Sequence, residues 1–176
     1  DATINDIRTA YDALKVTNAP FKLATCGWVL GPPNNRSLFD RELPNDVAVS
    51  CINRAVGHDP VEPGFAQVKN RDKWAIPWLE DDPAMTSPQL WVARMNRDAQ
   101  DALRYGCNGL MGIHWRTRVI APNVAALTQA SWADRPTEKV RRGRRARNAG
   151  SGIAGGFYAD WTLHEFGTEI SNDAAR

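Results

Sequence analysis

Two hydrophobic patterns alternate along this chain: stripes with helical spacing, and short runs that are nearly continuous in apolar residues. The first stripe predicts a helix that starts at a capping box and ends near Asn18 and Pro20. Its apolar positions are Ile4, Ile7, Tyr11 and Leu14. Ser37 is placed to cap a short helix over 38–43. Pro122 opens another helix that runs to about Ser131.

The apolar runs predict four β-strands, at 21–30, 47–52, 73–79 and 109–115. Gly/Pro-rich segments or helical stripes separate them, as expected for strand–helix alternation. Pro77 lies inside the third run, and proline cannot donate to a central ladder. We therefore expect a bulge or a strand end there.

Ser87-Pro88 predicts the start of a long helix, because Ser is a good N-cap and Pro suits the first helical turn. Gly106 ends it. The predicted buried face holds Val92, Met95, Ala99, Ala102 and Leu103. The residues predicted to face water for the most part are Arg94, Arg97, Asp98, Asp101 and Arg104.

Apolar strands that alternate with helices favour an α/β fold with a parallel sheet covered by helices on both faces. Eight strand–helix units of this length would make a (β/α)₈ barrel. Residues 1–132 contain four such units, which predicts half of a TIM-type barrel or a small open sheet. Residues 133–156 are polar, basic and then Gly-rich, which predicts a loop or insert. An aromatic stripe in 157–176 predicts a last helix packed on the domain.

Composition narrows the classes of function. The net charge of +2 is local: residues 139–147 hold six of the 22 basic residues and no acid, so the remainder is mildly acidic. We therefore expect no general attraction to nucleic acid, although this basic run could contact phosphates. The apolar runs are too short to span a bilayer and no leader pattern opens the chain, so we expect no membrane partner. The sequence does not determine the cellular location of the protein, and a secreted or periplasmic location is compatible with it.

The motifs of cofactor and metal chemistry are missing from the sequence. It has no dinucleotide fingerprint, P-loop, nucleophile elbow or zinc-protease motif, and its histidines lack metal-ligand spacing. We therefore expect neither a cofactor nor a metal. Cys26, Cys51 and Cys107 are widely spaced and are predicted to be buried structural thiols.

Candidate chemistry lies where the predicted strands end, because sites of parallel α/β folds gather there. After the third strand, side-chain alternation puts Glu80 on one face with Trp78 and Asp82, and Asp81 on the other. Two carboxylates beside an indole suit acid/base or nucleophilic work on a sugar. The alternative is an acidic loop that caps the turn before Pro83.

The other strand ends add further polar and aromatic residues. His114 and Arg116 share a face with Gly112 and suit recognition of hydroxyls or a carboxylate, although His114 could equally be a satisfied structural histidine. Trp28, Asn53 and Trp115 complete the predicted substrate-binding set with Trp78 and Arg116. Glu80, Asp82 and His114 form the predicted catalytic set.

These residues carry a resemblance to a family group. The runs Cys-Gly-Trp-Val-Leu-Gly-Pro, Ile-Pro-Trp-Leu-Glu-Asp-Asp-Pro and Gly-Ile-His-Trp-Arg-Thr resemble the later strands of a (β/α)₈ glycoside hydrolase. The run at 157–167 is similar to the helix that succeeds barrels of the α-glucuronidase and hexosaminidase kind. The resemblance implies that Glu80 closes the seventh strand as nucleophile and that Trp115 lines a sugar subsite. It also implies that the acid/base partner lies in a missing half of the barrel.

The sequence supports three hypotheses. The first is a fragment of a carbohydrate-active hydrolase that cleaves glycosidic bonds, with a carbohydrate as substrate. The second is a non-catalytic sugar-binding or scaffold α/β domain, since the seven tryptophans favour sugar stacking whether or not bonds break. The third and weakest is nucleic-acid binding through residues 139–147.

Overall fold

The computed structural model describes residues 2–26, 30–32, 34–53, 59–80, 87, 89–115, 118–132 and 153–168. Three short strands form a parallel sheet of order β1-β2-β3, so the strands lie side by side in chain order. The strands are β1 (Val49–Ile52), β2 (Lys73–Ile76) and β3 (Gly109–Leu110). The predicted α/β class and the parallel pairing are confirmed.

Isolated parallel bridges extend this sheet at two places. Ala24 pairs with Ala48, so the first predicted strand lies beside β1 as a single bridge within the part of 21–30 that the structure describes. Trp78 pairs with Ile113 and continues the β2–β3 ladder past the strand ends. β2 itself ends at Ile76, directly before Pro77, as the missing proline N–H predicts.

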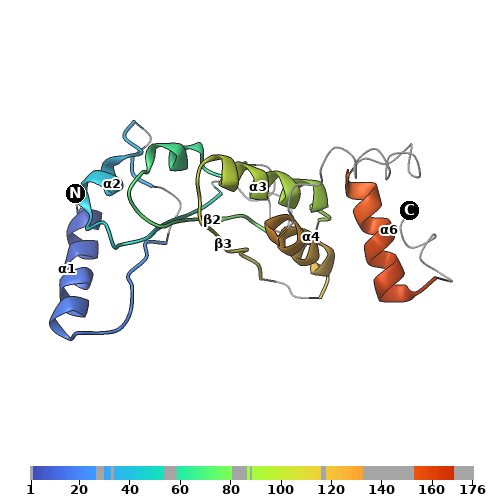
Figure 1. Ribbon diagram of the computed structural model, residues 1–176, viewed down its shortest axis with the longest axis horizontal. Helices are drawn as coiled ribbons and strands as arrows, with labels where there is room; N and C mark the ends of the chain where they lie inside the picture. The colour runs from blue at the N-terminus through green and yellow to red at the C-terminus, as the bar shows by residue number, and fades with distance from the viewer. Residues whose placement is uncertain are drawn as a thin grey trace.

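The helices are α1 (Ala2–Val16), α2 (Leu38–Glu42), the 3₁₀ helix η1 (Pro63–Gln67), α3 (Val92–Arg104), α4 (Ala121–Trp132) and α6 (Ile153–Phe166). Figure 1 shows α1 and α6 at opposite ends of an elongated molecule, with the sheet, α3 and α4 between them. None of these described helices is both long and apolar enough to cross a membrane. The basic run at 139–147 lies outside the described residues, and α6 starts before the predicted position 157.

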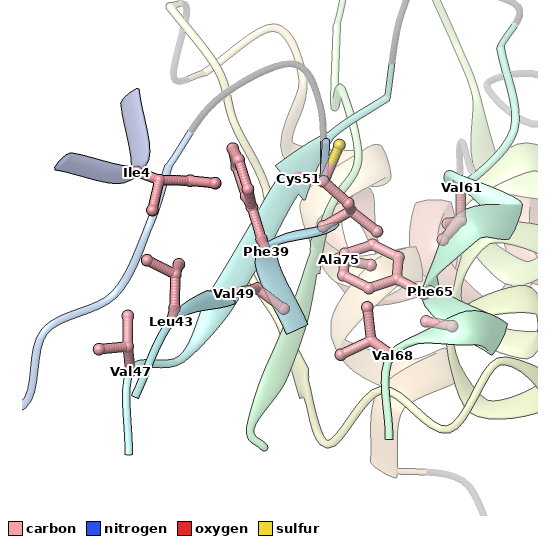
Figure 2. Packing of buried hydrophobic residues seen from close by; sticks show 12 residues of the cluster. Ile4, Phe39, Leu43, Val47, Val49, Cys51, Val61, Phe65, Val68 and Ala75 are labelled. Atoms are coloured by element: carbon pink, nitrogen blue, oxygen red, sulfur yellow. The ribbon is translucent and has the colours of Figure 1, made fainter. Parts of the chain in front are cut away.

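The main core joins the sheet to the helices of the N-terminal half. Val49, Cys51 and Ala75 come from one face of the sheet, and Phe39 of α2 and Phe65 of η1 pack against them (Figure 2). A second cluster joins Leu79 to the apolar faces of α3 and α4. Both clusters use sheet residues from the same face, because side chains alternate along a strand.

The opposite face of the sheet carries a separate, smaller cluster of Ile52, Ile76, Trp78 and Ile113. The register confirms this division, since Ile52 pairs with Ile76 and Trp78 pairs with Ile113. For the described residues, the helices thus pack on one face. The prediction of helices on both faces is not what this part of the chain shows, because η1 and α3, the described helices between consecutive strands, pack on the same side of the sheet.

The long helix starts later than predicted, at Val92 instead of Pro88. Asn123 of α4 is the reason: its Oδ1 accepts from the backbone N–H of Trp91 at 2.7 Å, and its Nδ2 donates to the carbonyl oxygens of Gln89 at 2.8 Å and Leu79 at 2.6 Å. These bonds hold 89–91 outside the helix. The start of α3 is therefore set by the Asn123 side chain of α4 and not by the local capping signal at Ser87-Pro88.

The face of α3 also departs from the prediction at two residues. Asp98, predicted to face water, is 1% exposed, and Leu103, predicted to be buried, is 59% exposed. Asp98 is three residues after Met95 and four before Ala102, so it lies on the same stripe as these two buried side chains. Leu103 lies one position past that stripe.

Two buried cationic side chains, those of Arg71 and Lys73, lie at the N-terminal end of β2. The guanidinium of Arg71 donates to the carbonyls of Asp40, Leu43, Pro44 and Val47 and pairs with the Asp40 carboxylate at 2.8 Å. The Lys73 ammonium donates to the carbonyls of Phe65, Val68 and Tyr105 at 2.7–2.8 Å. Both side chains therefore supply donors to backbone oxygens at this end of the sheet, two of which, those of Pro44 and Phe65, also accept from backbone N–H groups.

Candidate functional site at the carboxyl edge of the sheet

The ends of the three strands bring several predicted site residues to one edge of the sheet. Asn53 comes after β1, Glu80 after β2 and Trp115 after β3, and all three strands run in the same direction. The carboxyl ends of parallel strands share one edge, where α/β proteins place their ligand sites. This edge is the candidate site.

Glu80 is held by the neighbouring strand. Its Oε1 accepts a hydrogen bond from the backbone N–H of Trp115, and its side chain is completely buried. In the ladder before it, Met111 and Ile113 donate to the carbonyls of Ala75 and Pro77. The next donor in that alternation, in the segment after β3, is Trp115, so the Glu80 carboxylate takes the place of a backbone acceptor.

Asn53 and Trp78 are buried at this edge and bonded to each other. The Trp78 indole Nε1 donates to the carbonyl oxygen of Asn53 at 3.1 Å, and the Asn53 amide donates to the carbonyl of Asp59 at 3.0 Å. Asn53 is 0% and Trp78 is 3% exposed. Both residues were predicted to contact substrate; in the structure both side chains are buried and make these hydrogen bonds within the protein.

Trp115 presents the opposite situation, because its side chain is 73% exposed. Its backbone N–H is fixed by Glu80, so the indole is a surface aromatic beside a buried carboxylate. An exposed indole offers the apolar face on which sugar rings stack. The remaining predicted residues, Trp28, Asp82 and Arg116, lie outside the described residues.

His114 is not brought together with Glu80. It lines a hollow of about 360 Å³ with Leu79, Leu110, Gly112 and residues of α4. These sheet residues belong to the helix-covered face, and Glu80 alternates onto the other one. Gly112 makes room for a larger neighbour there: a Cβ on it would lie 2.6 Å from Cδ1 of Leu79.

A buried polar group that sequence reasoning missed lies close to Asn53. Asp98 of α3 pairs with Arg94 at 3.6 Å, and the Arg94 guanidinium reaches the carbonyl of Asp59. Burial raises the pKa of the Asp98 carboxyl to about 7, and Asp101 adds to the rise against the opposing effects of Arg94, Arg97 and Asn53. The sequence could have indicated its burial, because Asp98 lies on the same helical stripe as the apolar residues Met95 and Ala102.

A second hollow, of about 470 Å³, lies beside η1 and is lined by Arg36, Asp59, Glu62 and Gln67 among others. Arg36 is buried, donates to the carbonyl of Gly31 and pairs with Glu62 at 3.5 Å. Sequence reasoning singled out none of these residues. Because the guanidinium already faces a carboxylate, the hollow has no net positive site for an anion.

The described residues contain no group of three or more His, Cys, Asp and Glu side chains arranged to hold a metal ion. The three cysteines are free thiols. Burial raises the pKa of Cys51 to about 12 and that of Cys107 to about 11. Cys26 is exposed, so the prediction of buried structural thiols is wrong for that residue.

No protein-family model, curated protein or solved structure matches this chain. A functional assignment therefore rests on the geometry of the sheet edge.

Proposed function

We propose that the sheet is the later half of a (β/α)₈-type barrel. Strands that are sequential in space and joined by right-handed crossovers place every helix on the same face, as a barrel requires. A doubly wound sheet needs a reversal of strand order to use both faces. The order β1-β2-β3 and the packing of the described helices on one face support the barrel arrangement.

We propose further that the protein is a carbohydrate-active hydrolase in which the Glu80 carboxylate belongs to the reacting site. The observation that carries this is the pairing of Glu80 with Trp115 at the carboxyl edge, which sets a carboxylate beside an exposed indole. Glycosidic cleavage uses two carboxyl groups, ~5–5.5 Å apart for retention or ~6.5–9.5 Å for inversion. Asp82, or a carboxyl of the other barrel half, is the proposed partner. His114 is left out of the reacting set because it lies on the other face.

A second candidate is a sugar-binding or scaffold domain without catalysis. The complete burial of Glu80, and its place as a substitute acceptor in the ladder, favour this alternative. In that case Trp115 would stack on a sugar, while Glu80 would only hold the Trp115 backbone in place.

Substitution of Glu80 by Gln in the intact natural protein distinguishes the two candidate functions. Turnover is measured with a panel of aryl glycosides, and binding is measured with oligosaccharides. Gln keeps an acceptor oxygen for Trp115 but cannot act as nucleophile or base. We expect turnover to fall at least about 10³-fold with binding retained. Unchanged turnover would reject the catalytic role, and sugar binding without any turnover in the natural protein would favour the binding domain.

Trp115→Ala tests the sugar-stacking role shared by both candidates. Loss of a stacking indole is expected to weaken oligosaccharide affinity by about 10-fold or more. Trp132→Ala is the matched control, because Trp132 is 87% exposed but lies on α4 beside the hollow of His114. Equal affinities for the wild type and Trp115→Ala would rule out a sugar site at this edge.

A further inference from the structure

Asp98 is a buried carboxyl with unusual surroundings. It is 1% exposed, and among the described residues neither of its carboxylate oxygens receives a hydrogen bond. Oδ1 of the neighbouring Asn53, which is 0% exposed, also receives none. Three buried acceptor oxygens without donors are costly, because each has lost water without gaining a partner.

The groups that act on Asp98 come from α3 and from the end of β1. Arg94, Arg97 and Asp101 lie on α3, and the Asn53 amide comes after β1. Asp59, which precedes η1, acts on Arg94. The Arg94 Nε lies 3.6 Å from Oδ2 of Asp98, which is an ion-pair distance but longer than a normal hydrogen bond. The Asn53 amide favours the ionised form without reaching hydrogen-bond geometry.

A proton on Asp98 would supply the missing donor. A neutral carboxyl has one O–H donor, and Oδ1 of Asn53 is a buried acceptor on the adjacent side chain. The ionised carboxyl has no donor to offer to Oδ1 of Asn53; it is favoured by Arg94, Arg97 and the Asn53 amide instead. The two protonation states therefore satisfy different neighbours.

We propose that Asp98 is a protonation-dependent positioning residue, which in its neutral form hydrogen-bonds Oδ1 of Asn53 and fixes the end of β1. In its ionised form it no longer donates to Oδ1 of Asn53 and pairs with Arg94. Asn53 transmits the change, because its carbonyl oxygen accepts the indole N–H of Trp78. Trp78 lies two residues before Glu80, so a change in the protonation of Asp98 on α3 would alter the hydrogen bonding next to the candidate site. This inference is independent of the proposed sugar chemistry.

A divalent cation bound by the same oxygens is the competing explanation. The Arg94 guanidinium, 3.6 Å from Asp98, opposes a second positive charge at that place. Addition of Mg²⁺ or Ca²⁺ to the protein is therefore expected to leave the Trp78 environment unchanged. A shift produced by either cation that disappears in Asp98→Asn would overturn the protonation mechanism.

The main test monitors the indole ¹H–¹⁵N resonance of Trp78 from pH 5 to 8.5, assigned by its loss in Trp78→Phe. We expect a titration with a midpoint near neutral pH in the wild type and none in Asp98→Asn, since an amide donates at every pH. The resonance of Asp98→Asn should coincide with the acidic limit of the wild type. Asp101→Asn, which changes the same charge on the same helix, should still titrate.

Imidazole side chains titrate in the same range, so only the part of the shift that Asp98→Asn removes counts. If Trp78→Phe does not fold, the ¹³C-carboxyl resonance of Asp98, assigned by its absence in Asp98→Asn, gives the same midpoint. A carboxyl that titrates below pH 5, or a Trp78 shift of equal size in Asp98→Asn, would overturn the proposal.

Discussion

The backbone N–H of Trp115 donates to the carboxylate of Glu80 where a continuous ladder would use the carbonyl of Leu79. That carbonyl is taken by the amide of Asn123 from α4. A side chain thus ends the pairing of β2 with β3 at the edge where parallel α/β folds place their sites. Glu80 has a structural role whether or not it also has a chemical one, and the two roles can be measured separately.

The structural role of Glu80 predicts a difference between two variants. Glu80→Ala leaves the Trp115 N–H without its acceptor and should lower the free energy of unfolding by about 1–3 kcal/mol. Glu80→Gln keeps an acceptor oxygen and should lose less than half as much. Urea denaturation at pH 7 measures both values, and equal losses for Ala and Gln would contradict the role of the hydrogen bond.

Asn123 should be the most sensitive polar residue of α4. Asn123→Ala removes one acceptor and two donors that hold Leu79, Gln89 and Trp91, and we expect a loss of about 3 kcal/mol in unfolding free energy. Hydrogen exchange at the Trp91 amide should accelerate at the same time. Gln129→Ala, at an exposed position of the same helix, is the control and should stay within about 0.5 kcal/mol of wild type.

Arg71 should not tolerate lysine. Its planar guanidinium reaches four carbonyls and the Asp40 carboxylate together, and a single ammonium cannot reproduce that fork. We expect Arg71→Lys to lower the unfolding free energy by about 2–4 kcal/mol, close to the loss for Arg71→Ala. The exposed Arg41→Ala serves as the comparison in thermal and urea unfolding, and a near-neutral Arg71→Lys would contradict this account.

The raised pKa of Asp98 predicts how stability changes with pH. The folded state holds the Asp98 proton up to about pH 7, whereas the unfolded chain releases it near its ordinary pKa of 3.8. The folded state therefore binds more protons between these values, so this residue makes stability fall as pH rises, by at most about 1.4 kcal/mol per pH unit.

The difference in unfolding free energy between Asp98→Asn and wild type isolates this effect. It should grow in favour of Asn from pH 4.5 to 7 and level off above. Asp40 contributes with the opposite sign at lower pH, because burial raises its pKa but Arg71 and Lys69 lower it further. A difference that stays flat from pH 4.5 to 7 would contradict the assignment.

Thiol reactivity should distinguish the three cysteines. The exposed Cys26 should react with a disulfide reagent at pH 8 within minutes, whereas the buried Cys51, with its pKa raised to about 12, should react at a rate set by unfolding. The half-buried Cys107, with its pKa raised to about 11, should react at a rate between these two. Cys26→Ser should remove the fast phase. Modification of Cys51 as fast as that of Cys26 in the folded protein would contradict the burial of Cys51.

The sequence by itself determined the class of fold and the approximate elements. The apolar runs at 47–52 and 73–79 locate β1 and β2, the stripe from Val92 to Ala102 locates α3, and Gly106, with a φ of 74°, marks its end. These features are local, because hydrophobic periodicity and backbone restrictions depend on neighbouring residues only. The convergence of strand ends at one edge is also a consequence of parallel pairing.

The tertiary structure decided which polar side chains share a site. It separated His114 from Glu80, because two residues on paired strands meet only if the register puts them on the same face. It shortened α3 through Asn123, a partner more than 30 residues away in the chain. It also buried Asp98 against Asn53. Such contacts depend on register and packing between distant segments, which a periodic pattern of apolar residues does not encode.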